Sequence, residues 1–359
     1  MIELTLEANF SNPNQDPFVA RLGDTEGDNQ AVLVADNEDQ LVFSYQGSIF
    51  SIFKPHNGNL IGDIVYLQPG RSSAQRWIRD DSFHNTLLVT ERCDQLCIMC
   101  SQPPKKTHID YFEYFETACK LAPQDMVIGI SGGEPTLFKD QLFKLIEKTN
   151  EARPDLKFHI LTNGQHFVEA DIDRLRGPAF NQVLWGVPLY AARAKLHDEI
   201  VVKEGAFETL MSTLPIMAKA NINIELRTVL LKQNYKELLA LAGLIADRLP
   251  FLSFWAIMQL ERIGFAKNRW DTQFVDHSVD LSILEESVSR VCQTGMDVEL
   301  YNVPTCTVSE NLRPFLQQSI SDWKRSYPDE CNSCQEKTTC SGFFTWHNSL
   351  EDYQMGGPL

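Results

Sequence analysis

From residue 85 onward, apolar runs with the length of β-strands alternate with stretches whose apolar positions recur every three to four residues. This pattern predicts strand–helix repeats that build a parallel sheet with right-handed crossovers. The expected strands are Asn85–Thr90, Met126–Ile130, Lys157–Leu161, Gln182–Pro188, Ile222–Leu231 and Leu252–Met258. The expected helices lie near 108–122, 137–150, 166–176, 205–220 and 234–248. Six repeats favour an α/β fold curled as a full or partial barrel, and a doubly wound open sheet is the competing architecture.

The first 85 residues have a different pattern. Short β-like runs are separated by Gly, Asn and Asp turns, and no helical period is visible. The runs are Ala31–Val34, Gln40–Tyr45, Ser48–Phe53 and Asp63–Leu67. We therefore expect a small β-rich N-terminal domain over residues 1–84, a barrel over 85–290 and a cysteine-rich extension over 291–359.

Composition and charge narrow the function classes. Hydrophobic content of 43% and charged content of 22% are ordinary for a globular protein. A net charge of −16 repels phosphate backbones, which argues against a nucleic-acid substrate. The sequence shows neither a signal peptide nor an apolar run long enough to cross a membrane. Seven of the nine cysteines fall in two tight groups, which favours metal binding or catalysis over disulfides and a cytoplasmic location.

Three cysteines, Cys93, Cys97 and Cys100, follow the first strand of the repeats, spaced by three and then two residues. Thiolates this close can hold one corner of a cuboidal iron–sulfur cluster and leave the fourth iron open for a ligand. A structural zinc site or three buried apolar side chains are the alternatives. Zinc usually takes four protein ligands, and the immediate loop offers no fourth.

Two further motifs follow the next two strands. Gly132-Gly133-Glu134-Pro135 comes after the second strand, and Thr162-Asn163-Gly164 comes after the third. Each is a weak signal alone, because Gly-Gly and Asn-Gly pairs are first of all turn formers. However, the carboxyl ends of parallel strands meet at one rim, where active sites of such folds lie. We therefore expect the three motifs to converge there.

With this order of motifs, residues 85–265 resemble the radical S-adenosylmethionine (SAM) superfamily. The resemblance implies a partial (β/α)₆ barrel and a [4Fe–4S] cluster on Cys93, Cys97 and Cys100, whose open iron binds SAM. It also implies that Gly132, Gly133, Glu134 and Pro135 form the cofactor's cradle, and that reductive cleavage of SAM yields a 5′-deoxyadenosyl radical. Asn163 and Arg227 are weaker candidates for cofactor contacts, and a salt bridge is the alternative role for Arg227.

A second cysteine group lies near the C-terminus and comprises Cys306, Cys331, Cys334 and Cys340. Four thiolates could bind an auxiliary [4Fe–4S] cluster or a tetrahedral zinc ion, and His347 could replace Cys306. The spacing resembles the auxiliary-cluster extensions of radical enzymes that modify peptides. Cys119 and Cys292 lie within helical patterns, so we expect both to be buried apolar residues.

The runs Cys93–Lys105 and Cys331–Phe344 resemble the C-type component of the His-Xaa-Ser system radical SAM maturases. This resemblance implies a ribosomally made peptide or small-protein substrate with His-Xaa-Ser repeats, a partner radical SAM maturase and an external electron donor. Two alternatives remain open: a radical SAM enzyme acting on a small metabolite or tRNA, and a metal-binding scaffold without catalytic activity.

Overall fold

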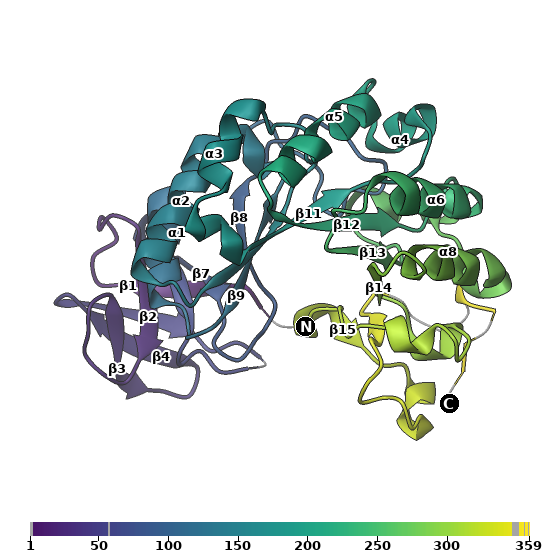
Figure 1. The fold of residues 1–359 in the computed structure, drawn as a ribbon. Helices are drawn as coiled ribbons and strands as arrows, with labels where there is room; N and C mark the ends of the chain where they lie inside the picture. Colours follow the sequence, from purple (N-terminus) through teal and green to yellow (C-terminus); the bar gives the residue numbers. More distant parts are fainter. Residues whose placement is uncertain (1–2, 57, 347–351, 355, 358) are drawn as a thin grey trace. The chain divides into compact units, whose positions relative to one another are not determined.

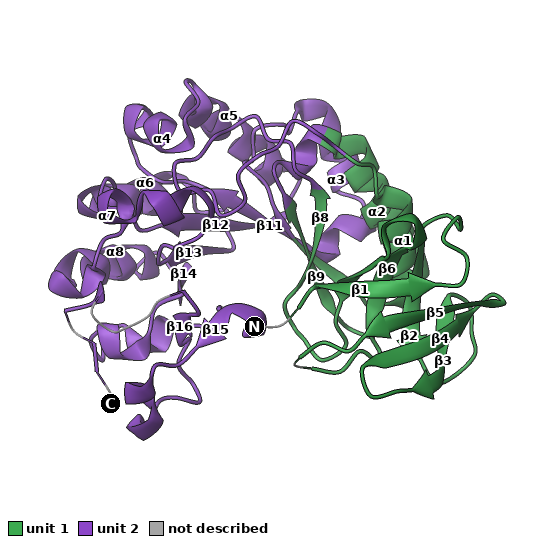
Figure 2. Cartoon of the chain, turned by 180° about the vertical axis from the view of Figure 1, so that it is seen from behind, with its two compact units in different colours: residues 1–89, 109–131, 138–159 green, residues 90–108, 132–137, 160–359 purple. Residues whose placement is uncertain are grey.

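The computed structural model describes residues 3–56, 58–346, 352–354, 356–357 and 359. The chain divides into two compact units, coloured separately in Figure 2. The first unit comprises residues 1–89, 109–131 and 138–159, and the second comprises residues 90–108, 132–137 and 160–359. Among the described residues, no helix is both long and apolar enough to span a membrane.

The first unit contains a closed seven-stranded β-barrel, which confirms the predicted β-rich N-terminal region (Figure 1). Its strand order is β1-β5-β4-β3-β2-β6-β7. The strands are β1 (Thr5–Phe10), β2 (Phe18–Gly23), β3 (Gln30–Asp36), β4 (Gln40–Tyr45), β5 (Ser48–Phe53), β6 (Ile64–Gln68) and β7 (Ser73–Ile78). Sequence reasoning missed β1, β2 and β7, because polar residues such as Arg21 and Arg76 interrupt their apolar runs.

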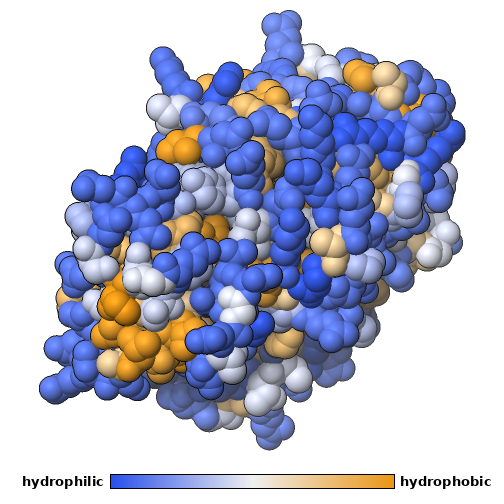
Figure 3. Space-filling model, turned by 90° about the vertical axis from the view of Figure 1, so that its left-hand side faces the viewer, coloured by the Kyte–Doolittle hydropathy of each residue, from blue (hydrophilic) through white to orange (hydrophobic). Residues whose placement is uncertain are grey.

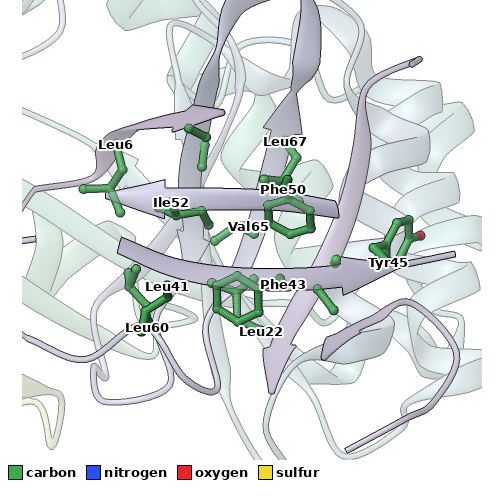
Figure 4. Close-up of a cluster of buried hydrophobic side chains, with 14 residues drawn as sticks. Leu6, Leu22, Leu41, Phe43, Tyr45, Phe50, Ile52, Leu60, Val65 and Leu67 are labelled. Atoms are coloured by element: carbon green, nitrogen blue, oxygen red, sulfur yellow. The ribbon is translucent and has the colours of Figure 1, made fainter. Parts of the chain in front are cut away.

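Alternate side chains of the barrel strands point into a common core (Figure 4). Phe43 and Ile52 are fully buried there, and the Phe43 and Phe50 rings stack with 5.5 Å between their centroids. A buried ion pair joins Arg76 Nε to Asp63 Oδ2 at 2.5 Å. The barrel therefore has a hydrophobic interior of its own within the first unit.

The remaining large sheet has seven strands in the order β14-β13-β12-β11-β10-β9-β8. Its strands are β8 (Asn85–Thr90), β9 (Val127–Gly132), β10 (Lys157–Leu161), β11 (Val183–Pro188), β12 (Asn223–Val229), β13 (Phe254–Met258) and β14 (Asp297–Tyr301). The pairs β11–β12, β12–β13 and β13–β14 are parallel. The order follows the chain, so the α/β fold is a partial barrel and the doubly wound alternative, whose strand order reverses, is excluded.

Helices alternate with these strands as the apolar periodicity predicts (Figure 1). They are α1 (Phe112–Leu121), α2 (Lys139–Ala152), α3 (Ile172–Leu175), α4 (Ala194–Val201), α5 (Ala206–Lys219), α6 (Leu238–Arg248), α7 (Trp270–Gln273) and α8 (Ser282–Cys292). Short 3₁₀ turns flank several of them, and a two-stranded hairpin, β15 (Arg325–Ser326) with β16 (Phe343–Phe344), lies in the C-terminal part.

The two faces of strands β11 to β14 differ in polarity. Register places the fully buried Trp185, Leu226 and Ile257 on alternate positions from Gly186 and Arg227. One face is therefore an apolar packing surface, while the other carries charged groups.

The two isolated cysteines have different environments. Cys119 in α1 is fully buried, as predicted. The prediction for Cys292 is wrong, because this residue is only partly buried. Cys292 is the last residue of α8, and the periodicity of the sequence does not show where a helix ends. The predicted boundaries at residues 84 and 290 stay a prediction.

Candidate functional site

The three sequence motifs follow consecutive strands in the structure. The loop of Cys93, Cys97 and Cys100 follows β8, Gly133-Glu134-Pro135 follows β9, and Thr162-Asn163-Gly164 follows β10. The three loops contact one another through hydrogen bonds within the second unit. Gly133 N–H donates to Thr90 O at 2.8 Å, and Glu134 N–H donates to Arg92 O at 2.7 Å. The expected convergence of the three motifs is therefore present.

The two glycines allow the second loop to lie directly against the cysteine loop. A Cβ on Gly132 would lie 2.0 Å from Thr90 O, and a Cβ on Gly133 would lie 2.0 Å from Arg92 O. Gly132 also has a φ of +142°, which L-amino acids rarely adopt. Both positions therefore require glycine, because any side chain would collide with the backbone of the cysteine loop. The sequence motif alone did not show this reason for the two glycines.

The side chain of Glu134 ties the second loop to the third. Its Oε1 accepts hydrogen bonds from Thr136 N (2.8 Å), Thr136 Oγ1 (2.5 Å) and Thr162 Oγ1 (2.7 Å). Its Oε2 accepts one from Asn163 N at 2.5 Å. Burial raises the pKa of Glu134, and the hydrogen bonds from Asn163, Thr136 and Thr162 oppose that rise. The buried carboxylate therefore joins the second loop to the third through hydrogen bonds.

Asn163 is likewise engaged with the protein. Its Nδ2 donates to Asp94 Oδ1 at 2.7 Å, and its Oδ1 accepts from Gln165 N at 3.1 Å. Asp94 also binds Lys203 Nζ at 2.5 Å and lies 3.3 Å from His166 Nε2. Burial acts to raise the pKa of Asp94, but the contacts with His166 and Lys203 hold it below its ordinary value. These groups fix the cysteine loop against the third motif.

Two more segments hold the cysteine loop on its other sides. Ile98 N–H donates to Ile200 O at 2.9 Å, and Ile98 O accepts from Gln273 Nε2 at 2.9 Å. Phe265 N–H donates to Cys100 O at 2.9 Å. A Cβ on Gly264 would lie 2.2 Å from that same oxygen, so the backbone at Gly264 lies directly against the backbone of the cysteine loop. The loop is therefore held by backbone contacts on several sides.

The three thiols provide a donor set that suits an iron–sulfur cluster. The pKa of Cys93 and of Cys97 is raised to about 12, mainly by burial, and the neighbouring acidic groups and thiols act in the same direction. Thiols in such surroundings ionise only when a positively charged group binds them, and a cluster iron supplies that charge. Among the described residues, no three His, Cys, Asp or Glu side chains have the arrangement of a preassembled metal-ion site.

Comparison with known proteins agrees with this geometry. Residues 87–245 match the family model of the radical SAM superfamily. These residues form a radical SAM domain. Such a domain implies a [4Fe–4S] cluster and SAM as cofactors.

Individual proteins similar to this chain include two curated enzymes. The chain is 24% identical over 156 residues to the AdoMet-dependent heme synthase of Methanosarcina barkeri, covering 42% of this chain and 43% of that enzyme. It is 25% identical over 196 residues to the GTP 3′,8-cyclase of Nautilia profundicola, covering 52% of this chain and 60% of that enzyme. The chain thus spans about half the length of the curated relatives it matches.

Two of the solved structures similar to this chain are enzymes crystallised with SAM. Native anSMEcpe with bound AdoMet aligns with a TM-score of 0.53 and 13% identity, covering 76% of this chain and 91% of that one. Streptococcus suis SuiB bound to S-adenosylmethionine aligns with a TM-score of 0.48 and 15% identity, covering 61% of this chain and 50% of that one. The likeness to anSMEcpe supports the partial-barrel architecture of the radical SAM domain.

Arg227 lies on β12 beneath the rim of the radical SAM domain and forms an internal ion pair. Its Nη1 donates to Glu225 Oε1 at 2.5 Å, and Glu225 is fully buried. The guanidinium also lies 5.9 Å from the centre of the Tyr301 ring. The salt-bridge alternative for Arg227 is therefore present, and a role in cofactor binding remains a prediction.

The C-terminal cysteines come from different parts of the chain: Cys306 lies in the 3₁₀ turn Thr305–Thr307, and Cys331 and Cys334 lie in and directly after the turn Asp329–Ser333. The pKa of Cys331 is raised to about 11. Burial is the main cause, and the neighbouring thiols of Cys306, Cys340 and Cys334 act in the same direction. The Cys340 sulfur accepts hydrogen bonds from the backbone of Thr305 (3.4 Å) and Gly342 (3.3 Å). Backbone N–H groups directed at sulfur stabilise a thiolate, which suits a metal ligand. His347 lies outside the described residues.

Sequence reasoning missed several residues that position the site. Lys203 and His166 belong to this group, as do Thr136, Gln273 and Gly264. Lys203 binds Asp94 across 109 positions of sequence, and no local pattern signals such a contact. Gly264 follows β13 closely, so its place after a strand offered a weak signal.

Proposed function

We propose that this chain is a radical SAM maturase that acts on a ribosomally made peptide or small protein. One observation carries the proposal: the backbone contacts of Gly133 and Glu134 hold their loop against the loop of the three cysteines. A cluster ligated by Cys93, Cys97 and Cys100 would therefore lie beside the proposed cofactor cradle. When bound, the cluster and SAM supply a 5′-deoxyadenosyl radical that removes a hydrogen atom from the substrate.

The chain's own residues would bind and orient these groups. In this proposal the three thiolates ligate iron, while Gly132 and Gly133 keep the cradle free of side chains. Glu134 and Asn163 maintain the spacing between the loops. This role is proposed in addition to the cofactor contacts predicted for these two residues. The fixed loops would restrict where the reactive atom lies, and positioning of this kind is the protein's share of cofactor chemistry.

The peptide substrate rests on two supports. The fold is shared with anSMEcpe, which was also solved with bound AdoMet and Cp18Cys peptide. The second support is the C-terminal cysteine group, proposed here to hold an auxiliary [4Fe–4S] cluster, with zinc as the alternative metal. A small protein with His-Xaa-Ser repeats is the specific substrate proposed, together with a partner radical SAM maturase and an external electron donor.

A second candidate function is the modification of a small metabolite. It is favoured by the similarity of the chain to a heme synthase and a GTP cyclase. Co-expression of the chain with a candidate His-Xaa-Ser protein, followed by mass spectrometry, separates the two. A mass change in the protein supports the maturase, and an unchanged protein beside an active enzyme supports the metabolite reaction.

Catalytic competence is tested by the variant Cys97→Ala beside a matched control, Cys292→Ala. After anaerobic reconstitution and reduction, we expect the parent protein and Cys292→Ala to convert SAM to 5′-deoxyadenosine. Cys97→Ala should release none and should lose about four irons, the content of one cubane. Retained cleavage by Cys97→Ala would refute the ligand assignment. A parent protein that binds iron but never cleaves SAM would instead indicate a non-catalytic scaffold.

A further inference from the structure

The outer surface of the N-terminal barrel carries apolar side chains that no other part of the described chain covers. Val34 and Ile49 are 55% and 43% exposed, and Val32 and Val42 beside them are partly exposed. We call these four residues the apolar patch. Figure 3 faces the side of the molecule where β3 and β4 lie in Figure 1, and apolar side chains gather there within a largely hydrophilic surface.

Strand alternation explains why these residues face outward. On β4, Leu41, Phe43 and Tyr45 point into the barrel core, so Val42 between them points out. The register aligns Val32 with Ser44 and Ser44 with Ile49 across three adjacent strands. An irregularity between Leu33 and Ala35 lies at Val34. The four apolar residues therefore share one outward face of β3, β4 and β5, where Ser44 and Ser51 lie beside them. We call this face the strip.

Acidic loops lie at both ends of this strip. Asp24, Glu26 and Asp28 precede β3, and Asp36, Glu38 and Asp39 lie at its end and in the turn to β4. All six are exposed. Residues 22–53 contain these six acidic residues and neither lysine nor arginine. The adjacent Lys54 forms an ion pair with Asp36 at 2.7 Å, which leaves five of the six carboxylates to set the negative charge. The strip thus has an apolar centre and negatively charged ends.

We propose that the apolar patch docks a segment of the substrate polypeptide with an apolar centre and basic residues on both sides. The proposal rests on the proposed function, because it takes the occupant to be the polypeptide that the radical SAM domain modifies. Exposed apolar areas bordered by polar residues are typical of interaction sites. Complementary charge at the border selects the partner and accelerates encounter.

The charges argue against other occupants. A second copy of this chain would bring acidic loops against acidic loops, at a net charge of −16 for each copy. Anionic lipid surfaces and nucleic acids would be repelled for the same reason. Each barrel strand pairs with a neighbour on both sides, so we expect docking through side chains on the sheet face and not through strand addition.

The test measures binding of two synthetic peptides to the full chain by fluorescence anisotropy. Both peptides have alternating valines and serines at the centre, flanked by lysine pairs in one and by glutamate pairs in the other. We expect the lysine peptide to bind and to weaken with added salt, and the glutamate peptide to bind at least about tenfold more weakly. Equal affinity for the two peptides would overturn the charge argument.

Variants locate the binding surface. The double change Val34→Ser and Ile49→Ser should weaken the lysine peptide about tenfold, because the buried apolar area of both side chains is lost. The matched control is Val168→Ser, which removes a 50% exposed valine of the second unit and should leave affinity unchanged. Exposed substitutions of this kind rarely alter stability by more than about 0.5 kcal/mol, so all variants should fold. Unchanged affinity in the double variant would disprove the location.

Further readouts separate this inference from the proposed function. Sedimentation of the chain over a range of concentrations should show no dimer that depends on the apolar patch. A dimer that the double change Val34→Ser and Ile49→Ser abolishes would overturn the choice of occupant. Release of 5′-deoxyadenosine from SAM in the absence of peptide should be the same in the parent and the double variant. A parent protein that cleaves SAM but does not bind the lysine peptide rejects docking alone. A parent protein that binds the lysine peptide but never cleaves SAM rejects the proposed function alone.

Discussion

The buried carboxylate of Glu134 offers a quantitative test of how the site is assembled. Glu134→Ala removes the acceptor for two backbone N–H groups, those of Thr136 and Asn163. It also removes the partner of the Thr136 and Thr162 hydroxyls, which lie 3.4 Å apart and can rotate to bond each other. The stability penalty therefore comes mainly from the two N–H groups.

Each buried donor left without a partner costs about 1–3 kcal/mol, so Glu134→Ala should destabilise the fold by about 2–6 kcal/mol. That is a large fraction of the roughly 5–15 kcal/mol that holds a typical domain together. Glu134→Gln keeps one acceptor oxygen and should cost about half as much. Five of the six tryptophans lie in the second unit and Trp77 in the first, so tryptophan fluorescence during urea unfolding reports mainly on the second unit.

Hydrogen exchange provides the local readout. In Glu134→Ala, peptides that contain the Thr136 and Asn163 amides should exchange faster than in the parent protein. Peptides from the N-terminal barrel should be unaffected, which makes them an internal control. If the two amides exchange at the parent rate in Glu134→Ala, the carboxylate does not hold the loops together and the reasoning is wrong.

Three further predictions follow from the same geometry. Gly133→Ala should destabilise the cysteine loop and lower iron content, whereas Gly243→Ala, with open space around its Cβ in a helix, should be neutral or stabilising by up to about 1 kcal/mol; thermal unfolding and iron assays compare the two. Burial lowers the pKa of His197 to about 4, so its stabilising contribution is present above pH 6.5 and is lost at about 1.4 kcal/mol per pH unit as pH falls toward 4. Urea titrations should show a shallower loss for His197→Gln, and an identical slope would contradict the cause. Cys331→Ser should remove one metal group and leave the other spectroscopically intact, whereas Cys292→Ser should remove neither.

Much of the fold could be read from apolar periodicity. The predicted ranges Asn85–Thr90 and Lys157–Leu161 coincide with β8 and β10, because both runs are apolar and bounded by turn residues. The barrel strands β1 and β7 escaped prediction, since polar residues such as Glu7 and Arg76 interrupt their short apolar runs. Burial of Cys292 was predicted wrongly because periodicity does not show where a helix ends against its neighbours.

Some features of the candidate site could likewise be predicted from the sequence, and others could not. The sequence alone determined which cysteines group together, that three motifs follow consecutive strands and that they belong on one rim, because these are consequences of spacing and of parallel-sheet geometry. Only the tertiary structure decided that the Glu134 carboxylate faces inward and that Lys203 reaches Asp94. Contacts of this kind depend on which segments meet after folding, and hydrogen-bond partners distant in sequence leave no periodic trace in it. The apolar patch had the same origin, since its residues share a face only after three strands align.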